Sequence, residues 1–385
     1  MKRISLIAIM ALMGIGSVAA KSSTTLPIVG EVVKATNPLI QYVGRVSFAK
    51  NETASFNFPG TSILARFQGS SLKMICRPMT GYFMAQVDGC EPFKVGFNAE
   101  RDSVVTVAAA LPKGEHQVKL MYVIEGLFRT PEFRGFVLDK GCSLVKSPDL
   151  PERKIEFIGN SITCGYGVES IEMTDPFEDE TENHWLTYAN IVSDSLNAQH
   201  TSISRSGIGV YRNYDGPKAG SDENMPWQYE YTLFNKHDEK WDFNKYQPQL
   251  VCINLGTNDL STNNYDITLY EKNYRMFLTT VRSKYPNAKI VLITGPMLGE
   301  KESGEQREVL DRICSDANKK GFTLPDEVRK ARKGKNKGDK DIYRFDFTFQ
   351  TGDLGYGASW HPSKLQHQKM ADELLPFLRN LMGWE

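Results

Sequence analysis

The residues best suited to chemistry lie in short segments after predicted strands, and the first of these segments contains Ser161. The mostly apolar run Ile155–Ile158 is followed by Gly159, Asn160 and Ser161, and two more glycines come soon after. This pattern predicts a buried strand that enters a tight turn. In a parallel α/β sheet, ligands bind beyond the carboxyl ends of the strands. Ser161 could present a nucleophilic hydroxyl there, and a helix N-cap is the alternative role for a serine in this position.

Three later segments carry further groups that could act together with a serine hydroxyl. Gly207 lies in the glycine-rich stretch after a second predicted strand, Asn258 follows a third, and His361 stands just before the last predicted helix. A histidine can accept the proton of a serine hydroxyl and return it to the leaving group. The backbone N–H groups of Ser161 and Gly207 and the side-chain amide of Asn258 could form an oxyanion hole. Each segment alone is a weak signal, but all four in this order are a strong one.

The elements that must position these groups alternate between strands and helices over residues 153–385. The predicted strands are Lys154–Ile158, His200–Ser204, Leu250–Leu255, Ile290–Thr294 and Ile342–Phe347. The predicted helices are His184–Asn197, one containing Tyr270–Val281, Glu305–Lys320 and Ser363–Met382. This alternation predicts a three-layer α/β domain, doubly wound around a parallel sheet with helices on both faces.

Residues 25–150 have a different texture, with many short apolar or alternating runs separated by turn signals. The predicted strands are Val43–Phe48, Thr53–Phe58, Ser62–Gln68, Leu72–Cys76, Tyr82–Val87, Phe93–Phe97, Ser103–Ala109, His116–Ile124 and Gly135–Leu138. This spacing predicts an all-β sandwich, most simply a jelly roll. The sandwich would either form one wall of the active site or bind carbohydrate. Pro148 and Pro151 mark the linker to the second domain.

Composition and the amino terminus limit the remaining possibilities. The 46 basic and 46 acidic residues cancel, so the chain lacks the charge expected of a nucleic-acid binder. The basic run Arg329–Lys337 is interpreted as a solvated loop.

Residues 1–20 have the charged, apolar and small-residue order of a cleavable secretory signal peptide, so we expect export to the periplasm or medium. The apolar run is too short for a membrane span. Six scattered cysteines permit disulfides, and no spacing typical of zinc occurs, so we expect neither metal nor other cofactor.

The four segments together resemble those of the SGNH, or GDSL-like, hydrolase superfamily, whose conserved blocks carry Ser, Gly, Asn and His. The resemblance covers residues 153–385 and implies a flavodoxin-like catalytic domain with Ser161 as nucleophile and His361 as general base. The stretches Gly44–Val46, Pro59–Thr61 and Phe67–Ser71, before Gly-Asn-Ser-Ile-Thr-Cys-Gly-Tyr-Gly, resemble the second family of carbohydrate esterases. That resemblance implies an acetyl xylan esterase-like enzyme, built from a jelly roll and an SGNH domain, which removes acetyl groups from plant-type polysaccharides or oligosaccharides.

One position departs from the superfamily pattern, in which an aspartate lies three residues before the histidine. Here that residue is Ala358, so we expect a backbone carbonyl near Trp360 to orient the imidazole of His361, with Asp353 as the alternative. Asp259 is expected to order its own loop. Trp360, Tyr211 and Trp227 are candidate substrate contacts, because flat aromatic faces line sugar sites.

Two other functions remain open from the sequence. One is an SGNH lipase, thioesterase or arylesterase that prefers longer acyl chains. The other is a non-catalytic glycan-binding protein in which the missing aspartate has removed activity. The sequence does not specify the oligomeric state.

Overall fold

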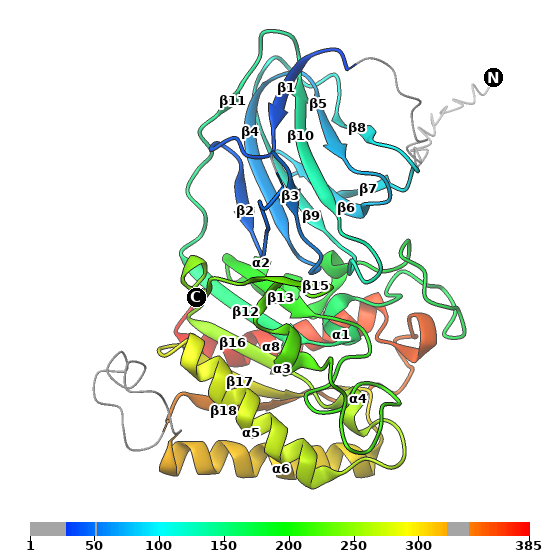
Figure 1. The fold of residues 1–385 in the computed structure, drawn as a ribbon, viewed down its shortest axis with the longest axis vertical. Helices are drawn as coiled ribbons and strands as arrows, with labels where there is room; N and C mark the ends of the chain where they lie inside the picture. Colours follow the sequence, from blue (N-terminus) through cyan, green and yellow to red (C-terminus); the bar gives the residue numbers. More distant parts are fainter. Residues whose placement is uncertain (1–27, 51, 322–338) are drawn as a thin grey trace, which may run out of the picture.

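The computed structural model describes residues 28–50, 52–321 and 339–385, which form two domains stacked on one another (Figure 1). Antiparallel strands make up the amino-terminal domain, and a parallel sheet with helices makes up the second. The signal-peptide segment 1–20 and the basic run 329–337 lie outside the described residues.

The amino-terminal domain consists of two antiparallel sheets packed around one core. One sheet has the order β1 (Glu31–Lys34), β10 (Glu132–Leu138), β5 (Leu72–Cys76) and β8 (Ser103–Ala108), with β3 (Ala54–Ser55) also paired to β10. The other has the order β11 (Leu144–Val145), β4 (Ser62–Gly69), β9 (Gly114–Tyr122), β6 (Gly81–Val87) and β7 (Phe93–Phe97), with β2 (Gln41–Val43) paired to β4. Buried side chains from both sheets, including Met74, Phe83 and Phe136, share one apolar cluster. The domain is therefore the expected sandwich of antiparallel strands.

The structure corrects several predicted strand boundaries in this domain. Strand β2 ends where the predicted strand Val43–Phe48 was to begin, and only an isolated bridge at Ser47 lies within that range. The strands β1 and β11 were not predicted. Strand β1 is largely exposed, with the burial alternation of a core strand missing, so its sequence carried little signal.

The second domain is built on a five-stranded parallel sheet with the order β13 (Ala198–Ser204), β12 (Arg153–Gly159), β16 (Leu250–Asn254), β17 (Lys289–Thr294) and β18 (Ile342–Asp346). All five were predicted to within about two residues. Because β12 lies between β13 and β16 and is parallel to both, the segments after β12, β13 and β16 emerge at the same edge of the sheet.

Helices cover both faces of this sheet, as Figure 1 shows. The helices α5 (Ile267–Lys284) and α6 (Glu300–Lys320) pack on one face, and α2 (Tyr188–Ser195) and α8 (Lys364–Met382) pack on the other. Strand β16 makes this division clear, because Val251 and Ile253 join the first cluster while Leu250 and Cys252 join the second. The strand is buried on both sides, which explains its continuous apolar sequence.

Two features of this domain differ from the sequence expectations. The predicted helix His184–Asn197 is a short 3₁₀ helix, η1 (His184–Leu186), and then α2, separated by Thr187 in an extended conformation. A hairpin of β14 (Tyr231–Leu233) and β15 (Lys236–Lys240) was missed. None of the helices in the described ranges has an apolar stretch long enough to cross a bilayer.

Candidate active site

Ser161 begins the short helix α1 (Ser161–Cys164), which follows β12 after the single residue Asn160. The cap of this helix is Asn160, whose side chain accepts the N–H of Ile162 at 3.0 Å. The Ser161 hydroxyl is therefore not used for capping. Gly159 permits the tight turn, because a Cβ there would lie 2.1 Å from the Thr163 hydroxyl oxygen. Strand, cap and glycine together fix the direction of the serine.

The structure brings His361 against Ser161, although 200 residues separate them. Nε2 of His361 lies 2.8 Å from Oγ of Ser161. Nδ1 lies 3.0 Å from the carbonyl oxygen of Ala358 and 3.2 Å from that of Ser359. A carbonyl oxygen can only accept, so these contacts favour the tautomer with its proton on Nδ1. Nε2 is then free to accept a proton from the serine hydroxyl.

The segment before His361 adopts an unusual backbone conformation that supplies these carbonyls. Ser359 and Trp360 both have left-handed dihedrals, with φ of 50° and 59°. Such values are uncommon for residues other than glycine and carry a cost of order 1–3 kcal/mol each. The segment is held by a 3.0 Å hydrogen bond from the N–H of Ala358 to the carbonyl of Gly167. The two left-handed residues thus lie between Ala358 and His361, in the turn that brings the carbonyls of Ala358 and Ser359 to the imidazole.

An aromatic stack supports the imidazole from the side. The ring of Tyr166 stacks on that of His361, with 4.2 Å between centroids and 26° between planes, and the ring of Phe177 packs on Tyr166 at 4.6 Å. Burial lowers the pKa of His361 to about 4. The imidazole is therefore neutral near pH 7, which is the form that can act as a base. The sequence interpretation did not assign Tyr166 a role, although it lies in the Ser161 motif.

The alternative carboxylate, Asp353, lies elsewhere. Its Oδ2 accepts the hydroxyl of Thr351 at 2.8 Å, and none of the described hydrogen bonds or ion pairs joins it to His361. The carbonyl oxygens of Ala358 and Ser359, near Trp360 in the chain, are the backbone acceptors at Nδ1 of His361.

Asp259 is a buried carboxylate that orders the segment after β13. Its oxygens accept the N–H groups of three consecutive residues, at distances of 2.8 to 3.1 Å: Val210, Tyr211 and Arg212. Asp259 was expected to order its own loop, and the structure adds that three of its partners belong to the neighbouring loop. Burial raises its pKa to about 6.

The two other candidate donors lie beyond the neighbouring strands. Gly207 follows β13 with φ of 74°, and a Cβ added to it would meet nothing within 4 Å, so open space lies in front of it. Asn258 is in α4 (Thr257–Leu260), where its Nδ2 donates to the carbonyl of Ile208 at 2.8 Å. An amide nitrogen carries two hydrogens. This bond therefore fixes the side chain and uses one of them.

The three aromatic candidates for substrate contact differ in accessibility. Trp360 is 53% exposed beside His361. Trp227 is half-buried and packs against Tyr231 and His237. Tyr211 is only 1% exposed, and its hydroxyl accepts the N–H of Asp266, so the expectation of a sugar contact at Tyr211 is corrected. Tyr211 follows a glycine-rich stretch, and its local sequence did not indicate that its ring would pack in the core.

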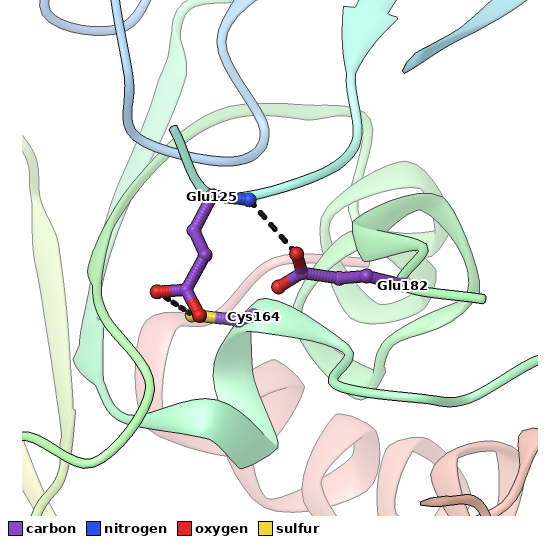
Figure 2. Close-up of side chains that lie close together, drawn as sticks. All are labelled: Glu125, Cys164 and Glu182. Carbon is purple, nitrogen blue, oxygen red and sulfur yellow. Dashed lines mark hydrogen bonds between the residues drawn. The ribbon is translucent and has the colours of Figure 1, made fainter. Parts of the chain in front are cut away.

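One group of buried side chains, which includes the last residue of α1, has ligand atoms close enough to share a cation. Among the described residues, Glu125, Cys164 and Glu182 place their ligand atoms within 4.8 Å of one another (Figure 2). Part of this donor set is already used, because an oxygen of each glutamate accepts a backbone N–H. All six cysteines are free, and Cys252 is buried in β16 as expected.

Comparison with known proteins agrees with this geometry. Residues 42–148 match the carbohydrate esterase 2 N-terminal family, and residues 155–374 match the GDSL-like lipase/acylhydrolase family. The chain is 34% identical over 351 residues to the cellulase/esterase CelE of Acetivibrio thermocellus, covering 90% of this chain but only 40% of that protein. It is 27% identical to an acetylxylan esterase / glucomannan deacetylase of Cellvibrio japonicus, with 91% of both chains covered.

Solved structures give the same result. A family two carbohydrate esterase from Clostridium thermocellum, in complex with cellohexaose, superposes with a TM-score of 0.79 at 34% identity, covering 90% of this chain and all of that one. A family two carbohydrate esterase from Cellvibrio japonicus superposes with a TM-score of 0.78 at 25% identity, covering 92% and 98%. The chain therefore belongs to the GDSL-like lipase/acylhydrolase family and, within it, to the family 2 carbohydrate esterases.

Proposed function

We propose that this protein is an esterase that removes O-acetyl groups from plant-type polysaccharides or oligosaccharides through an acetyl-serine intermediate. The observation that carries the proposal is the 2.8 Å contact between Nε2 of His361 and Oγ of Ser161 at the carboxyl edge of a parallel sheet. The names of the similar proteins, acetylxylan esterase / glucomannan deacetylase and cellulase/esterase, support the substrate class.

In the first half of the reaction, Oγ of Ser161 bonds to the carbonyl carbon of the acetyl ester while its proton passes to Nε2 of His361. The negative charge on the carbonyl oxygen is stabilised by the proposed donors, namely the N–H groups of Ser161 and Gly207 and the second amide hydrogen of Asn258. When the carbon–oxygen bond to the sugar breaks, the imidazolium returns the proton to the sugar oxygen.

In the second half, water attacks the acetyl-serine and gives a proton to Nε2 of His361. The intermediate then collapses, the proton returns to Oγ of Ser161, and acetate leaves. The carbonyls of Ala358 and Ser359 keep the proton on Nδ1 and accept stronger hydrogen bonds when the ring becomes charged. In this proposal they replace the carboxylate of a complete triad.

The direct test is release of acetate from acetylated xylan and glucomannan by the wild type and by Ser161→Ala. We expect turnover by the wild type and a fall of about 10⁶-fold in the variant. Asn258→Ala should reduce kcat by about 10²–10³-fold, the usual loss for one oxyanion donor. If butyrate and longer esters react faster than acetate, the enzyme is instead a longer-chain esterase. If both forms bind glycan without turnover, it is a binding protein.

The finer assignments of the fold are also proposals. The strand order of the parallel sheet, 2-1-3-4-5 in chain order, supports a flavodoxin-like domain over residues 153–385. The two facing antiparallel sheets support a jelly roll over residues 25–150. Export rests on the sequence pattern of residues 1–20, and sequencing the amino terminus of the secreted protein would test it.

A further inference from the structure

We propose that Glu125, a residue of the amino-terminal domain, is a positioning residue of the active site that holds the Ser206–Gly207 segment in place for oxyanion binding. The inference rests on the proposed esterase function. It makes the β-rich domain a structural part of the reaction centre.

The proposal begins with a contact between the two domains. Glu125 follows β9, and its Oε2 accepts the backbone N–H of Ser206 at 2.7 Å. Ser206 directly precedes Gly207, the proposed oxyanion donor, and the two form the segment that follows β13. A carboxyl oxygen can accept an N–H group whether or not the acid is ionised, and Glu125 is only 3% exposed, so water does not compete freely for this contact.

The catalytic domain in turn holds Glu125. Oε2 of Glu182 accepts the backbone N–H of Glu125 at 3.0 Å, and the thiol of Cys164 lies 3.9 Å from Oε2 of Glu125. Figure 2 shows the two carboxyl groups side by side with Cys164 next to them. Cys164 ends α1, the helix that Ser161 begins. The cluster therefore connects the nucleophile helix, the loop of the other domain and the segment before Gly207.

The hydrogen bond from the Ser206 N–H to Glu125 restrains a segment in which Gly207 has no side chain to pack. Gly207 has a left-handed backbone and open space where a side chain would be, so packing of its own does not hold it. The N–H of Ser206 is a backbone group one residue away, and Glu125 is its partner. Loss of this acceptor would leave a partly buried N–H without its partner and let the segment move. A displacement of about 1 Å in a reacting group can reduce the rate by about 10²-fold.

The experiment compares Glu125→Ala and Glu125→Gln with the wild type, using 4-nitrophenyl acetate. This small ester makes few contacts outside the acetyl site, so changes on it report on the reaction centre. We expect Glu125→Ala to lower kcat by about 10- to 100-fold with KM within about 3-fold. Glutamine keeps an oxygen that can accept the Ser206 N–H, so Glu125→Gln should stay within about 3-fold of the wild-type kcat.

Glu132 provides a matched control. It is also a buried glutamate of the amino-terminal domain, 2% exposed, and it is the first residue of β10. Its carboxylate, however, pairs with Lys50 and Arg77. Glu132→Ala should leave kcat per folded molecule unchanged. Glu125→Asp, whose carboxylate is one methylene too short to reach Ser206, should show the kcat loss of Glu125→Ala and serves where the alanine variant does not fold.

The outcomes separate this inference from the proposed function. An active wild type together with an unchanged kcat in Glu125→Ala or Glu125→Asp would overturn the positioning role alone. An equal loss in Glu132→Ala would also overturn it, since the effect would then be general destabilisation. If neither the wild type nor the variants hydrolyse any ester, both the positioning role and the proposed esterase function are overturned.

Discussion

The two domains each hold a partly buried histidine, and their surroundings shift the histidine pKa in opposite directions. In the sandwich, Nδ1 of His116 lies 2.6 Å from a carboxylate oxygen of Asp88, and this hydrogen bond raises the pKa of His116. In the catalytic domain, Nδ1 of His361 meets only carbonyl oxygens, and burial lowers its pKa to about 4. The carboxylate contact therefore outweighs burial at His116, whereas at His361 burial outweighs the two carbonyl contacts, which by themselves would raise the pKa. The proposed dyad uses the second arrangement.

The largest effect should come from removing each histidine in turn. His361→Ala should reduce kcat for acetate release by about 10⁶-fold, because the serine then lacks its base. His116→Ala should leave kcat unchanged, since His116 lies in the other domain with Asp88 as its partner. Steady-state kinetics on folded protein will decide. Comparable losses in both variants would remove the distinction between the two histidines.

The pH dependence of kcat/KM should distinguish a His361 with a lowered pKa from an ordinary histidine. Since His361 must be neutral to accept the serine proton, kcat/KM falls only as pH drops through its pKa. With a pKa of about 4, the fall between pH 7 and pH 5 should be about 10%. An ordinary histidine with a pKa of about 6.5 would lose about 25-fold over the same interval. An acid limb centred near pH 6.5 would mean that an anion stabilises the charged ring.

Neutralising the spare carboxylate should have little effect. Asp353→Asn should keep kcat within about 3-fold of wild type, because Asp353 bonds to Thr351 and not to the imidazole. Neutralising the aspartate of a complete triad reduces kcat by about 10⁴-fold. A loss of that size would place Asp353 at Nδ1 during turnover and contradict the carbonyl arrangement.

The smallest effect concerns the sandwich histidine and stability. The folded pKa of His116 is raised, so its pairing with Asp88 stabilises the fold below the unfolded pKa of histidine and this gain is lost as pH rises through the folded pKa. Asp88→Asn should therefore lower the melting temperature slightly more at pH 5 than at pH 9. An equal change at both pH values would show that the Asp88 contact with the Gln117 N–H dominates.

The sequence predicted most of the catalytic framework because its signals were local. Apolar runs such as Leu250–Asn254 identify buried parallel strands, and the segments after β12, β13 and β16 carry the candidates Ser161, Gly207 and Asn258. His361 became a candidate through the order of the four segments and their resemblance to the SGNH blocks. The departure at Ala358 was also visible, and it directed attention to the backbone carbonyls.

Other features depend on contacts that no local pattern records. The left-handed backbone of Ser359 and Trp360 is set by the bond from Ala358 to Gly167, which is distant in sequence. Glu125 reaches Ser206 across the domain interface, 81 residues away. Tyr211 was misread because aromatic residues occur both in sugar sites and in cores, and only the fold distinguishes the two.

The central claim is that Ser161 carries the acetyl group during turnover. The most direct measurement is mass spectrometry of peptides after rapid mixing with 4-nitrophenyl acetate and acid quenching. The account predicts one acetyl group on the peptide containing Ser161 in the wild type and none on that peptide in Ser161→Ala. Acetylation of a different residue during turnover, or undiminished turnover by Ser161→Ala, would contradict it.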